Sequence, residues 1–309
     1  MLFRSAAFDE DGELEAQLAT AEAGIFRVRG ERDAGGVAKP PQYTSEYVDY
    51  FMRSSEEKQS VNGVLSGFSE IDRVMGGFES PHLYVLGARP GMGKSALAVN
   101  VAIEAAVKGT KRVAIFSLEM SKKQIMNRSL SYITRIPSEN IQKPWTLSVD
   151  EKKRVMATVG QMSESRLFID DSPALTPSQI RARCLRLQAE FGLDLVIIDH
   201  LHIMRPDTTL RGNRNLEITE ITASLAALGK QLEAPILLLC QLSRGVEGRA
   251  DRRPMLSDLR DSGTIEQDAY AVMFLYRDAY YNDDSAAGNG AEVLIAKNRE
   301  GATGKVDII

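Results

Sequence analysis

Cysteine and tryptophan are scarce in this chain. Its 309 residues include 2 cysteines and 1 tryptophan. Cys184 and Cys240 lie in apolar, periodic segments, and two cysteines in so long a chain cannot form the disulfide framework of a small secreted domain. We therefore interpret both as reduced core residues of a cytosolic protein. The lone Trp145 follows Pro144 between two expected helices, and we interpret it as a packing residue.

Long apolar runs are also missing. No run approaches the roughly 20 residues that a membrane-spanning helix requires, and the N-terminus lacks a signal-peptide pattern. These absences argue against a membrane or secreted protein and predict a cytoplasmic location. With 43% hydrophobic and 26% charged residues, the chain is typical of a globular protein that buries a full core, either as one large domain or as one domain with an appendage.

An excess of basic charge is the third thing the chain lacks. It carries 38 Lys and Arg against 42 Asp and Glu, a net charge of −4. Residues 1–60 hold 7 basic and 12 acidic residues, which leaves 31 and 30 for the rest. A uniformly basic nucleic-acid binder is therefore excluded. A near-neutral domain can still bind nucleic acid if a few arginines converge on one surface.

The first sixty residues form a separate segment. Residues 1–43 are polar and acidic and end at a break, "DAGGVAKPPQ". A short amphipathic helix is expected over 44–58, with Thr44 or Ser45 as its N-cap, because its apolar residues fall at helical spacing. Those residues are Tyr47, Val48, Phe51 and Met52. We expect an acidic leader with a linker helix in residues 1–60 that packs on the main domain or on a neighbouring subunit.

From residue 61 to 309, apolar strands alternate with helices. Strands are expected at 82–88, 112–119, 193–199, 235–241, 270–277, 291–299 and 305–309. Helices are expected at 95–108, 121–136 and 216–233, with two more that begin at capping boxes, Ser148 with Glu151 and Thr176 with Gln179. Buried strands alternating with helices predict an α/β domain with a mostly parallel, twisted sheet covered on both faces.

The stretch "YVLGARPGMGKS" resembles a phosphate-binding loop with one departure. The pattern G-x-x-x-x-G-K-[ST] ends at Gly93-Lys94-Ser95, but its first glycine is replaced by Ala88, and Gly87 lies one position too early. The loop follows a strand and opens a helix, as phosphate binding requires. Alanine is acceptable if its φ is negative, and an ordinary turn does not need Gly-Lys-Ser. The predicted nucleotide-binding residues are Ala88, Arg89, Pro90, Gly91, Met92, Gly93, Lys94 and Ser95.

Three polar residues end neighbouring apolar strands. Asp199 ends "LVIID" and is a candidate Mg²⁺ ligand with the Ser95 hydroxyl; the alternative is an aspartate that caps the next element. Glu119 follows the strand "RVAIFSL", where it could polarise an attacking water or simply cap the next helix. Gln241 ends "PILLLCQ", where an amide could respond to the γ-phosphate. The sequence therefore predicts a hydrolytic nucleotide site at one edge of the sheet.

Two further segments are ambiguous. The stretch "LSRGVEGRADRRPMLSDLRDSG" contains five arginines among four carboxylates. It is either a solvated loop of mixed charge or a loop that grips DNA through residues such as Arg244. The pair His200 and His202 lies beside Asp199, but no third metal ligand is evident, so packing or hydrogen bonding is favoured over zinc.

Together these motifs resemble the ATPase domain of DnaB-type replicative helicases. The similarity covers about four-fifths of the chain, from "GVLSGFSEIDRVMGGF" to the C-terminus. Its strongest parts are "ARPGMGKS", "FSLEMS", "LVIIDHLHIM", "QLSRGVEGRADRRPMLSDLRDSGTIEQDA" and "AKNREGATG". The family's phosphate loop begins with alanine or glycine followed by Arg-Pro, so Ala88 matches it. The resemblance implies a RecA-like P-loop NTPase core over residues 61–309 that uses ATP and Mg²⁺.

The resemblance also implies individual roles. Lys94 and Ser95 would bind the phosphates and Mg²⁺, with Asp199 orienting Mg²⁺ through water. Glu119 would be the catalytic base and Gln241 the γ-phosphate sensor. Arg299 would be an arginine finger that acts in the adjacent subunit, with Lys297 as its companion. Single-stranded DNA would be held by "RDSG", through Arg260 and the main chain near Asp261 and Gly263, with Arg244 nearby.

The expected function is therefore an ATP-dependent replicative helicase, a hexameric ring that moves 5′ to 3′ on single-stranded DNA by family resemblance. Two departures stand out: the family commonly has tyrosine and glutamine at positions 200 and 202, and its helical N-terminal domain, which meets primase or a loader, is mostly absent. The alternatives are a recombinase-like, DNA-stimulated ATPase and a non-catalytic, ATP-gated scaffold or loader adaptor. Glu119, Lys297 and Arg299 argue against the scaffold.

Overall fold

The computed structural model describes residues 40–57, 63–208, 213–259, 263–282 and 284–309. Contacts between residues divide the chain into two units, Met1–Lys58 and Gln59–Ile309, and each is described by itself. None of the helices in the described part of the chain is long and apolar enough to span a bilayer.

Helix α3 (Pro40–Glu57) is the described element of the first unit. It begins at Pro40, so the predicted N-cap at Thr44 or Ser45 is wrong. Proline is well tolerated in the first turn because its missing N–H would have no helical partner there. The Thr44 hydroxyl lies inside the helix and donates to the carbonyl oxygen of Pro40 at 2.8 Å, a local bond that helix interiors allow.

The apolar side chains of α3 lie on one side of the helix. Tyr47, Val48, Phe51 and Met52 are all more than half exposed. The rings of Tyr47 and Phe51 stack with their centroids 6.5 Å apart, as residues four apart on a helix do. Since α3 exposes this apolar face, it has the character of a helix that packs against another surface.

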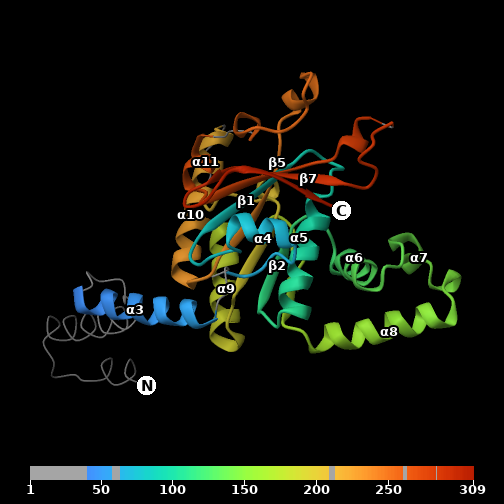
Figure 1. The fold of residues 1–309 in the computed structure, drawn as a ribbon, viewed down its shortest axis with the longest axis horizontal. Coiled ribbons are helices and arrows are strands. Elements are labelled where there is room, and N and C mark those ends of the chain that lie inside the picture. The colour runs from blue at the N-terminus through green and yellow to red at the C-terminus, as the bar shows by residue number, and fades with distance from the viewer. Residues whose placement is uncertain (1–39, 58–62, 209–212, 260–262, 283) are drawn as a thin grey trace, which may run out of the picture. The chain divides into compact units, whose positions relative to one another are not determined.

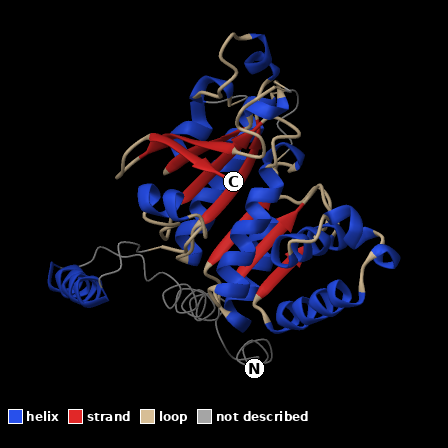
Figure 2. Ribbon diagram, turned by 45° about the vertical axis from the view of Figure 1, so that its right-hand side comes forward, coloured by secondary structure: helices blue, strands red, loops and turns tan. Residues whose placement is uncertain are grey.

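The second unit is built on an eight-stranded sheet (Figures 1 and 2). Its strands lie in the order β3-β2-β4-β5-β1-β6-β7-β8. The first six strands in this order, β3 through β6, pair in parallel. The last two pairings, β6 with β7 and β7 with β8, are antiparallel. The bounds are β1 (Leu83–Ala88), β2 (Val113–Ser117), β3 (Leu167–Asp170), β4 (Leu195–Asp199), β5 (Ile236–Gln241), β6 (Ala271–Tyr276), β7 (Ala291–Asn298) and β8 (Gly304–Ile308). The predicted mostly parallel sheet is confirmed.

Helices cover both faces of this sheet (Figure 2). Successive side chains of a strand point to opposite faces, so Tyr84 and Leu86 belong to one buried cluster and Leu83 and Val85 to another. The first cluster includes α4 and α5, and the second includes α9, α10 and α11. Their bounds are α4 (Ser69–Met75), α5 (Lys94–Ile103), α9 (Pro177–Phe191), α10 (Arg214–Leu232) and α11 (Gly263–Asp268).

Three further helices form a lobe to one side of the sheet (Figure 1). They are α6 (Lys122–Thr134), α7 (Ser138–Gln142) and α8 (Val149–Glu164). A small core of four aliphatic residues joins them: Leu130, Ile136, Ile141 and Leu147. Trp145 lies outside that core in a short turn and is 76% exposed, so its interpretation as a packing residue is wrong. Partly buried side chains of α6 and α8 complete the packing: Met126, Val155, Val159 and Met162.

Other expectations about local structure are confirmed or corrected. Both capping boxes are present, with Ser148 N–H donating to Glu151 at 2.8 Å and Thr176 N–H donating to Gln179 at 3.0 Å. Cys184 and Cys240 are buried free thiols, and burial raises the pKa of each to about 12. The sequence analysis did not predict β3. This strand has only four residues, three apolar and one acidic, and so short a run does not distinguish a strand from a loop.

Candidate nucleotide-binding site

The predicted site residues converge at the carboxyl ends of adjacent parallel strands. Ala88 at the end of β1 pairs with Gln241 at the end of β5. Ser117 at the end of β2 pairs with Asp199 at the end of β4, and Glu119 follows two residues later. Because parallel strands deliver their carboxyl ends to one edge of the sheet, four strands place their terminal residues around one crevice.

A pocket at this edge contains most of the predicted nucleotide-binding residues. It is lined by Ala88, Arg89, Pro90, Gly91, Gly93, Lys94, Ser95, Ala96, Glu119, Arg128, His200 and Gln241. Asp199 and Met92 are not among them. The Met92 side chain is buried in the core, so in this loop only its backbone is available to a ligand.

The variant first position of the loop has a structural explanation. Ala88 is the last residue of β1, is buried, and does not have a positive φ. A methyl group is therefore accommodated where the common pattern has glycine. The preceding Gly87 is the crowded position, because a Cβ there would lie 2.8 Å from the Phe274 ring. The glycines that the turn needs are Gly91 and Gly93, at φ of 82° and 98°.

The loop leads directly into α5. Gly93 is the N-cap residue of this helix, and Lys94 and Ser95 begin its first turn. Backbone N–H groups in the first turn have no helical partners and lie at the positive end of the helix dipole. The turn between β1 and α5 can therefore receive phosphate oxygens, and the Ser95 hydroxyl lies beside it.

Lys94 and Asp199 form a buried pair that is not fully bonded. The Lys94 Nζ lies 3.7 Å from Asp199 Oδ1, with side-chain exposures of 11% and 7%. This distance is too long for a hydrogen bond, and Oδ1 has no other hydrogen-bond partner among the described residues. Burial lowers the pKa of Lys94, and the Asp199 carboxylate acts in the opposite direction.

A buried carboxylate oxygen without a partner is uncommon. It fits a site that binds a cation through an intervening water, with the Ser95 hydroxyl as the other protein ligand. The donor set is hydroxyl and carboxylate oxygen, which suits Mg²⁺. These residues therefore fit the metal expected for a phosphate loop.

Glu119 faces the same pocket from the turn after β2. Its side chain is 58% exposed, and its Oε2 lies 3.6 Å from Nε2 of the buried His200. The backbone before it is held firmly, since Leu118 N–H donates to the Asp199 carbonyl oxygen at 2.7 Å. Burial lowers the pKa of His200 to about 3, with Lys94 and His202 adding to the shift. The imidazole is therefore neutral at neutral pH, and this contact is not an ion pair.

Gln241 lies between the nucleotide pocket and a second pocket formed by the segment that follows β5. The second pocket is lined by Arg89, His202, Gln241, Leu242, Ser243 and Arg244. Arg89 joins the two: its guanidinium donates to Glu247 at 2.7 and 2.9 Å and to the Leu242 carbonyl oxygen at 2.8 Å. The phosphate loop is thereby bonded to the arginine-containing segment after Gln241.

Two arginines of that segment form ion pairs with carboxylates of this chain. Arg249 donates to Asp258 at 2.6 and 3.1 Å. Arg253 forms a two-bond pair with Glu292, at 2.7 and 2.8 Å, and lies over the Tyr276 ring. These two arginines are structural. Arg244 has no hydrogen bond or ion pair with any described residue and faces the second pocket.

The predicted DNA-binding group is only partly described. Arg260 and Asp261 lie outside the described residues. Gly263 begins α11, and a Cβ placed there would meet nothing within 4 Å. The space that a side chain at Gly263 would occupy is therefore free of other described residues.

The predicted finger residues lie away from this chain's own pocket. Lys297 Nζ donates to the carbonyl oxygens of Glu266 and Ala269, the latter at 2.7 Å. Arg299 donates to the Gln267 carbonyl oxygen at 2.7 Å. Both cations thus bond to the carboxyl end of α11, where a positive charge is favourable, and neither lines the nucleotide pocket.

Sequence reasoning missed several residues of the site. Arg128 on α6 lines the pocket. The Tyr280 ring lies against the loop, since a Cβ on Gly91 would come within 2.6 Å of it. Glu247 forms the pair with Arg89. These contacts join segments far apart in sequence, and no local pattern indicates them.

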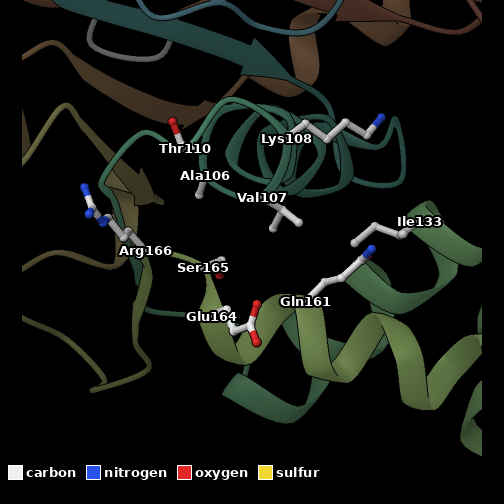
Figure 3. A pocket seen from close by; sticks show the side chains of 9 residues that line it. All are labelled: Ala106, Val107, Lys108, Thr110, Ile133, Gln161, Glu164, Ser165 and Arg166. Atoms are coloured by element: carbon white, nitrogen blue, oxygen red, sulfur yellow. The ribbon is translucent and has the colours of Figure 1, made fainter.

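Another pocket, lined by residues of the η1 turn (Glu104–Lys108), α6 and α8, is shown in Figure 3. Arg166, which lines it, immediately precedes β3. The pocket therefore lies at the amino ends of the strands, opposite the phosphate loop. Lys108, Glu164 and Arg166 lie apart around it (Figure 3). It offers no phosphate loop and no converging set of catalytic groups.

Comparison with known proteins agrees with this geometry. The family model for the DnaB-like helicase C terminal domain matches residues 63–309. The replicative DNA helicase DnaB of Geobacillus stearothermophilus is 39% identical over 301 residues, which cover 97% of this chain and 66% of that protein. The replicative DNA helicase DnaB of Pasteurella multocida is 42% identical over 257 residues, covering 82% and 55%. The chain thus spans less than two thirds of the length of these relatives.

Solved structures give the same result for the fold. The ATPase domain of G40P superposes with a TM-score of 0.80 at 32% identity, covering 85% of this chain and 93% of that one. A DnaB-like replicative helicase, studied with its interactions with primase, superposes with a TM-score of 0.78 at 30% identity, covering 94% and 69%. The expected RecA-like P-loop core is confirmed.

Proposed function

Because the chain belongs to the family of the DnaB-like helicase C-terminal domain, we propose that it is the ATP-driven motor of a replicative DNA helicase. The observation that carries this proposal is the pocket at the carboxyl edge of the sheet. There a phosphate loop, the buried Lys94–Asp199 pair, the exposed Glu119 and the strand-terminal Gln241 surround one space. This combination suits hydrolysis of a nucleoside triphosphate and exceeds what binding alone requires.

Each residue of the pocket has a distinct role in the proposed hydrolysis. The backbone N–H groups from Gly91 to Ser95 and the Lys94 ammonium hold the β- and γ-phosphates. Glu119 accepts a proton from the attacking water, and its exposed carboxylate can reach solvent in the pocket. The Gln241 amide contacts the γ-phosphate and changes its contacts when that group leaves. When bound, Mg²⁺ neutralises charge on the phosphates; Ser95 and, through water, Asp199 would hold it.

Hydrolysis is proposed to need a second subunit. Lys297 and Arg299 are absent from the chain's own pocket and lie at the end of β7, so we place them in the neighbouring subunit's site. An arginine finger accounts for a factor of about 10³–10⁵ in rate. Without a neighbour, each pocket would bind ATP and turn it over slowly.

Single-stranded DNA is the proposed track. Arg244, which has no hydrogen bond or ion pair with a described residue, and Arg260 would contact phosphates, together with the main chain near Asp261 and Gly263. Phosphate contacts carry little base preference. A ring would gather these few arginines in its central channel, so a chain of net charge −4 can still bind DNA. The 5′ to 3′ direction and the cytoplasmic location are proposed on the family alone.

Ring assembly is supported by the exposed apolar face of α3. Tyr47, Val48, Phe51 and Met52 form a surface that water does not favour, and a neighbouring subunit would cover it. We propose a hexamer.

A recombinase-like ATPase remains the second candidate because it would use the same core. The two differ in product: a helicase releases one strand of a forked duplex, and a recombinase coats DNA and exchanges strands. A nucleotide-gated scaffold is disfavoured by the position of Glu119 in the pocket.

The decisive experiment is ATP hydrolysis with and without single-stranded DNA across a dilution series, paired with unwinding of a forked duplex. Stimulation by DNA that collapses on dilution, together with strand release, is expected. Turnover that is indifferent to DNA and to protein concentration would overturn the motor. Strand exchange without unwinding would favour the recombinase.

A further inference from the structure

The two histidines after β4 are not accounted for by the roles above. His200 is buried, with 8% of its side chain exposed, and it still lines the nucleotide pocket. His202 follows in the short η3 turn (Leu201–Ile203). A buried polar ring that borders a ligand pocket requires a partner on each nitrogen.

The Nδ1 atom of His200 is an acceptor. The backbone N–H of His202 donates to it at 3.3 Å. In a neutral imidazole one nitrogen accepts and the other carries the proton. Because Nδ1 accepts this hydrogen bond, the proton of His200 lies on Nε2.

The protonated Nε2 faces Glu119. The distance from Nε2 to Glu119 Oε2 is 3.6 Å, slightly longer than a hydrogen bond. Hydrogen bonds of catalytic groups are often long before substrate is bound and tighten in the complex. No other hydrogen bond holds the Glu119 carboxylate within the described part of the chain. His200 is thus the group placed to fix the direction of an otherwise exposed side chain.

The same short segment also reaches Gln241. The Gln241 backbone N–H donates to His202 Nδ1 at 3.4 Å. The backbone N–H of Leu118, next to Glu119, donates to the backbone carbonyl oxygen of Asp199 at 2.7 Å. Residues 199–202 therefore contact the turn that carries Glu119 on one side and the end of β5 on the other.

We propose that His200 is a positioning residue for hydrolysis: its Nε2–H orients the Glu119 carboxylate toward the attacking water. The inference rests on the proposed ATPase function of the site. The rest of the segment holds the imidazole in the tautomer that makes this possible. A role confined to packing would place no requirement on the Nε2 proton.

The test compares two substitutions of similar size. His200→Gln keeps an N–H group near the position of Nε2, and His200→Leu removes it. We expect His200→Leu to lower kcat for ATP about 10²-fold, the scale of misplacing a catalytic group. KM and the affinity for a fluorescent, non-hydrolysable ATP analogue should stay within about twofold. His200→Gln should recover most of kcat.

The third histidine supplies the matched control. His82 stacks on Tyr270 outside the pocket, with ring centroids 3.9 Å apart, so His82→Gln should leave kcat unchanged. Thermal melting of each variant checks folding. If His200→Leu does not fold, His200→Tyr, which carries a hydroxyl donor, is compared with His200→Phe, which does not.

Two results would overturn the inference: full kcat in the variant that lacks a donor, or equal loss in the paired variants with and without one. The comparison is between the kcat values of the variants and of wild-type protein. It therefore fails separately from the proposed motor function, which fails if the turnover of wild-type protein does not respond to DNA.

Discussion

The two ends of strand β4 carry an aspartate each, and the two are used in opposite ways. Asp194, just before the strand, accepts three hydrogen bonds from Arg112, at 2.6 to 2.7 Å, including one from its backbone N–H. Asp199, at the other end, lies 3.7 Å from Lys94, and one of its buried oxygens has no hydrogen bond from the described residues. The same charge pairing is complete at the amino edge and incomplete at the carboxyl edge.

The two aspartates show that a charged pair with missing hydrogen bonds marks the edge of a parallel sheet that binds a ligand. A pair with all its hydrogen bonds satisfied stabilises the fold and has no capacity left for a ligand. A buried pair with unused capacity loses stability from desolvation, and a ligand that supplies the missing contacts recovers it. Substitutions at the carboxyl edge should therefore affect activity, and those at the amino edge should affect stability.

The largest effect is expected from removing both charges of the incomplete pair. Lys94→Met with Asp199→Asn should reduce ATP hydrolysis below detection, because the phosphates lose the Lys94 ammonium and Mg²⁺ loses the Asp199 carboxylate. The free energy of unfolding should be unchanged or higher, since two poorly paired buried charges are gone. Hydrolysis assays and urea denaturation measure the two quantities. A marked fall in stability would mean that this pair is structural after all.

Arg299→Ala should lower hydrolysis by about 10³–10⁵-fold. The residue is proposed to act in the neighbouring site, so the loss should be partly rescued when the variant is mixed with Glu119→Gln protein. In such mixtures some sites combine an intact Glu119 with an intact Arg299. Lack of any rescue, or unchanged turnover in Arg299→Ala alone, would remove the finger assignment.

Glu119→Gln should lower hydrolysis by about 10²–10⁴-fold, the range for a general base. Binding of ATP should persist, because the phosphate loop and Lys94 are intact. The melting temperature should barely change, since the side chain is 58% exposed. Titration with a fluorescent ATP analogue checks binding; weakened binding would show that Glu119 contacts the nucleotide itself.

A smaller effect is expected at the amino edge. Arg112→Met with Asp194→Asn removes hydrogen bonds to charged groups, worth about 1.5–3 kcal/mol each when buried. Both side chains are partly exposed, so solvent screening reduces the expected loss of stability to about 1 kcal/mol. Hydrolysis per folded molecule should stay at the wild-type level. Loss of turnover without loss of stability would break the contrast between the two edges.

The smallest expected effect is a pH dependence of the stability that the Arg112–Asp194 pair contributes. Burial alone would raise the pKa of Asp194, but the hydrogen bonds and charge of Arg112 outweigh it and hold the pKa below its usual value. The pair's contribution to stability is then fully present above about pH 4, the unfolded value, and is lost as pH falls through the folded pKa. Urea denaturation from pH 3 to 7 should show the double variant converging with wild type at the acid end.

The candidate site was predictable to the extent that its motifs are local. Gly93-Lys94-Ser95, and the polar ends of three apolar strands, are each contained in a few residues, and parallel strands bring such ends together. Their roles remain predictions. Arg128, Tyr280 and Glu247 could not be predicted, because each reaches the loop from a distant segment through packing.

Errors in the prediction share a physical cause. The helix start at Thr44 was wrong because a threonine can cap a helix or bond back to a carbonyl inside one, and the local sequence allows both. The exposure of Trp145 depends on how three helices meet, which its own neighbours do not encode. The sequence also left open whether the arginines after Gln241 bind DNA or lie in a loop of mixed charge; the carboxylate partners of Arg249 and Arg253 are seen only in the folded structure.

The alternation of strands and helices, the phosphate-loop pattern and the family resemblance can all be read from the amino-acid order, because they depend on periodicity and on residue types at short spacing. Which charged groups have all their hydrogen bonds is set by long-range packing. Asp194 and Asp199 flank one strand and are equally acidic in the sequence. The neighbours folded against each end complete the hydrogen bonds of one and leave an oxygen of the other unbonded, and no local pattern contains those neighbours.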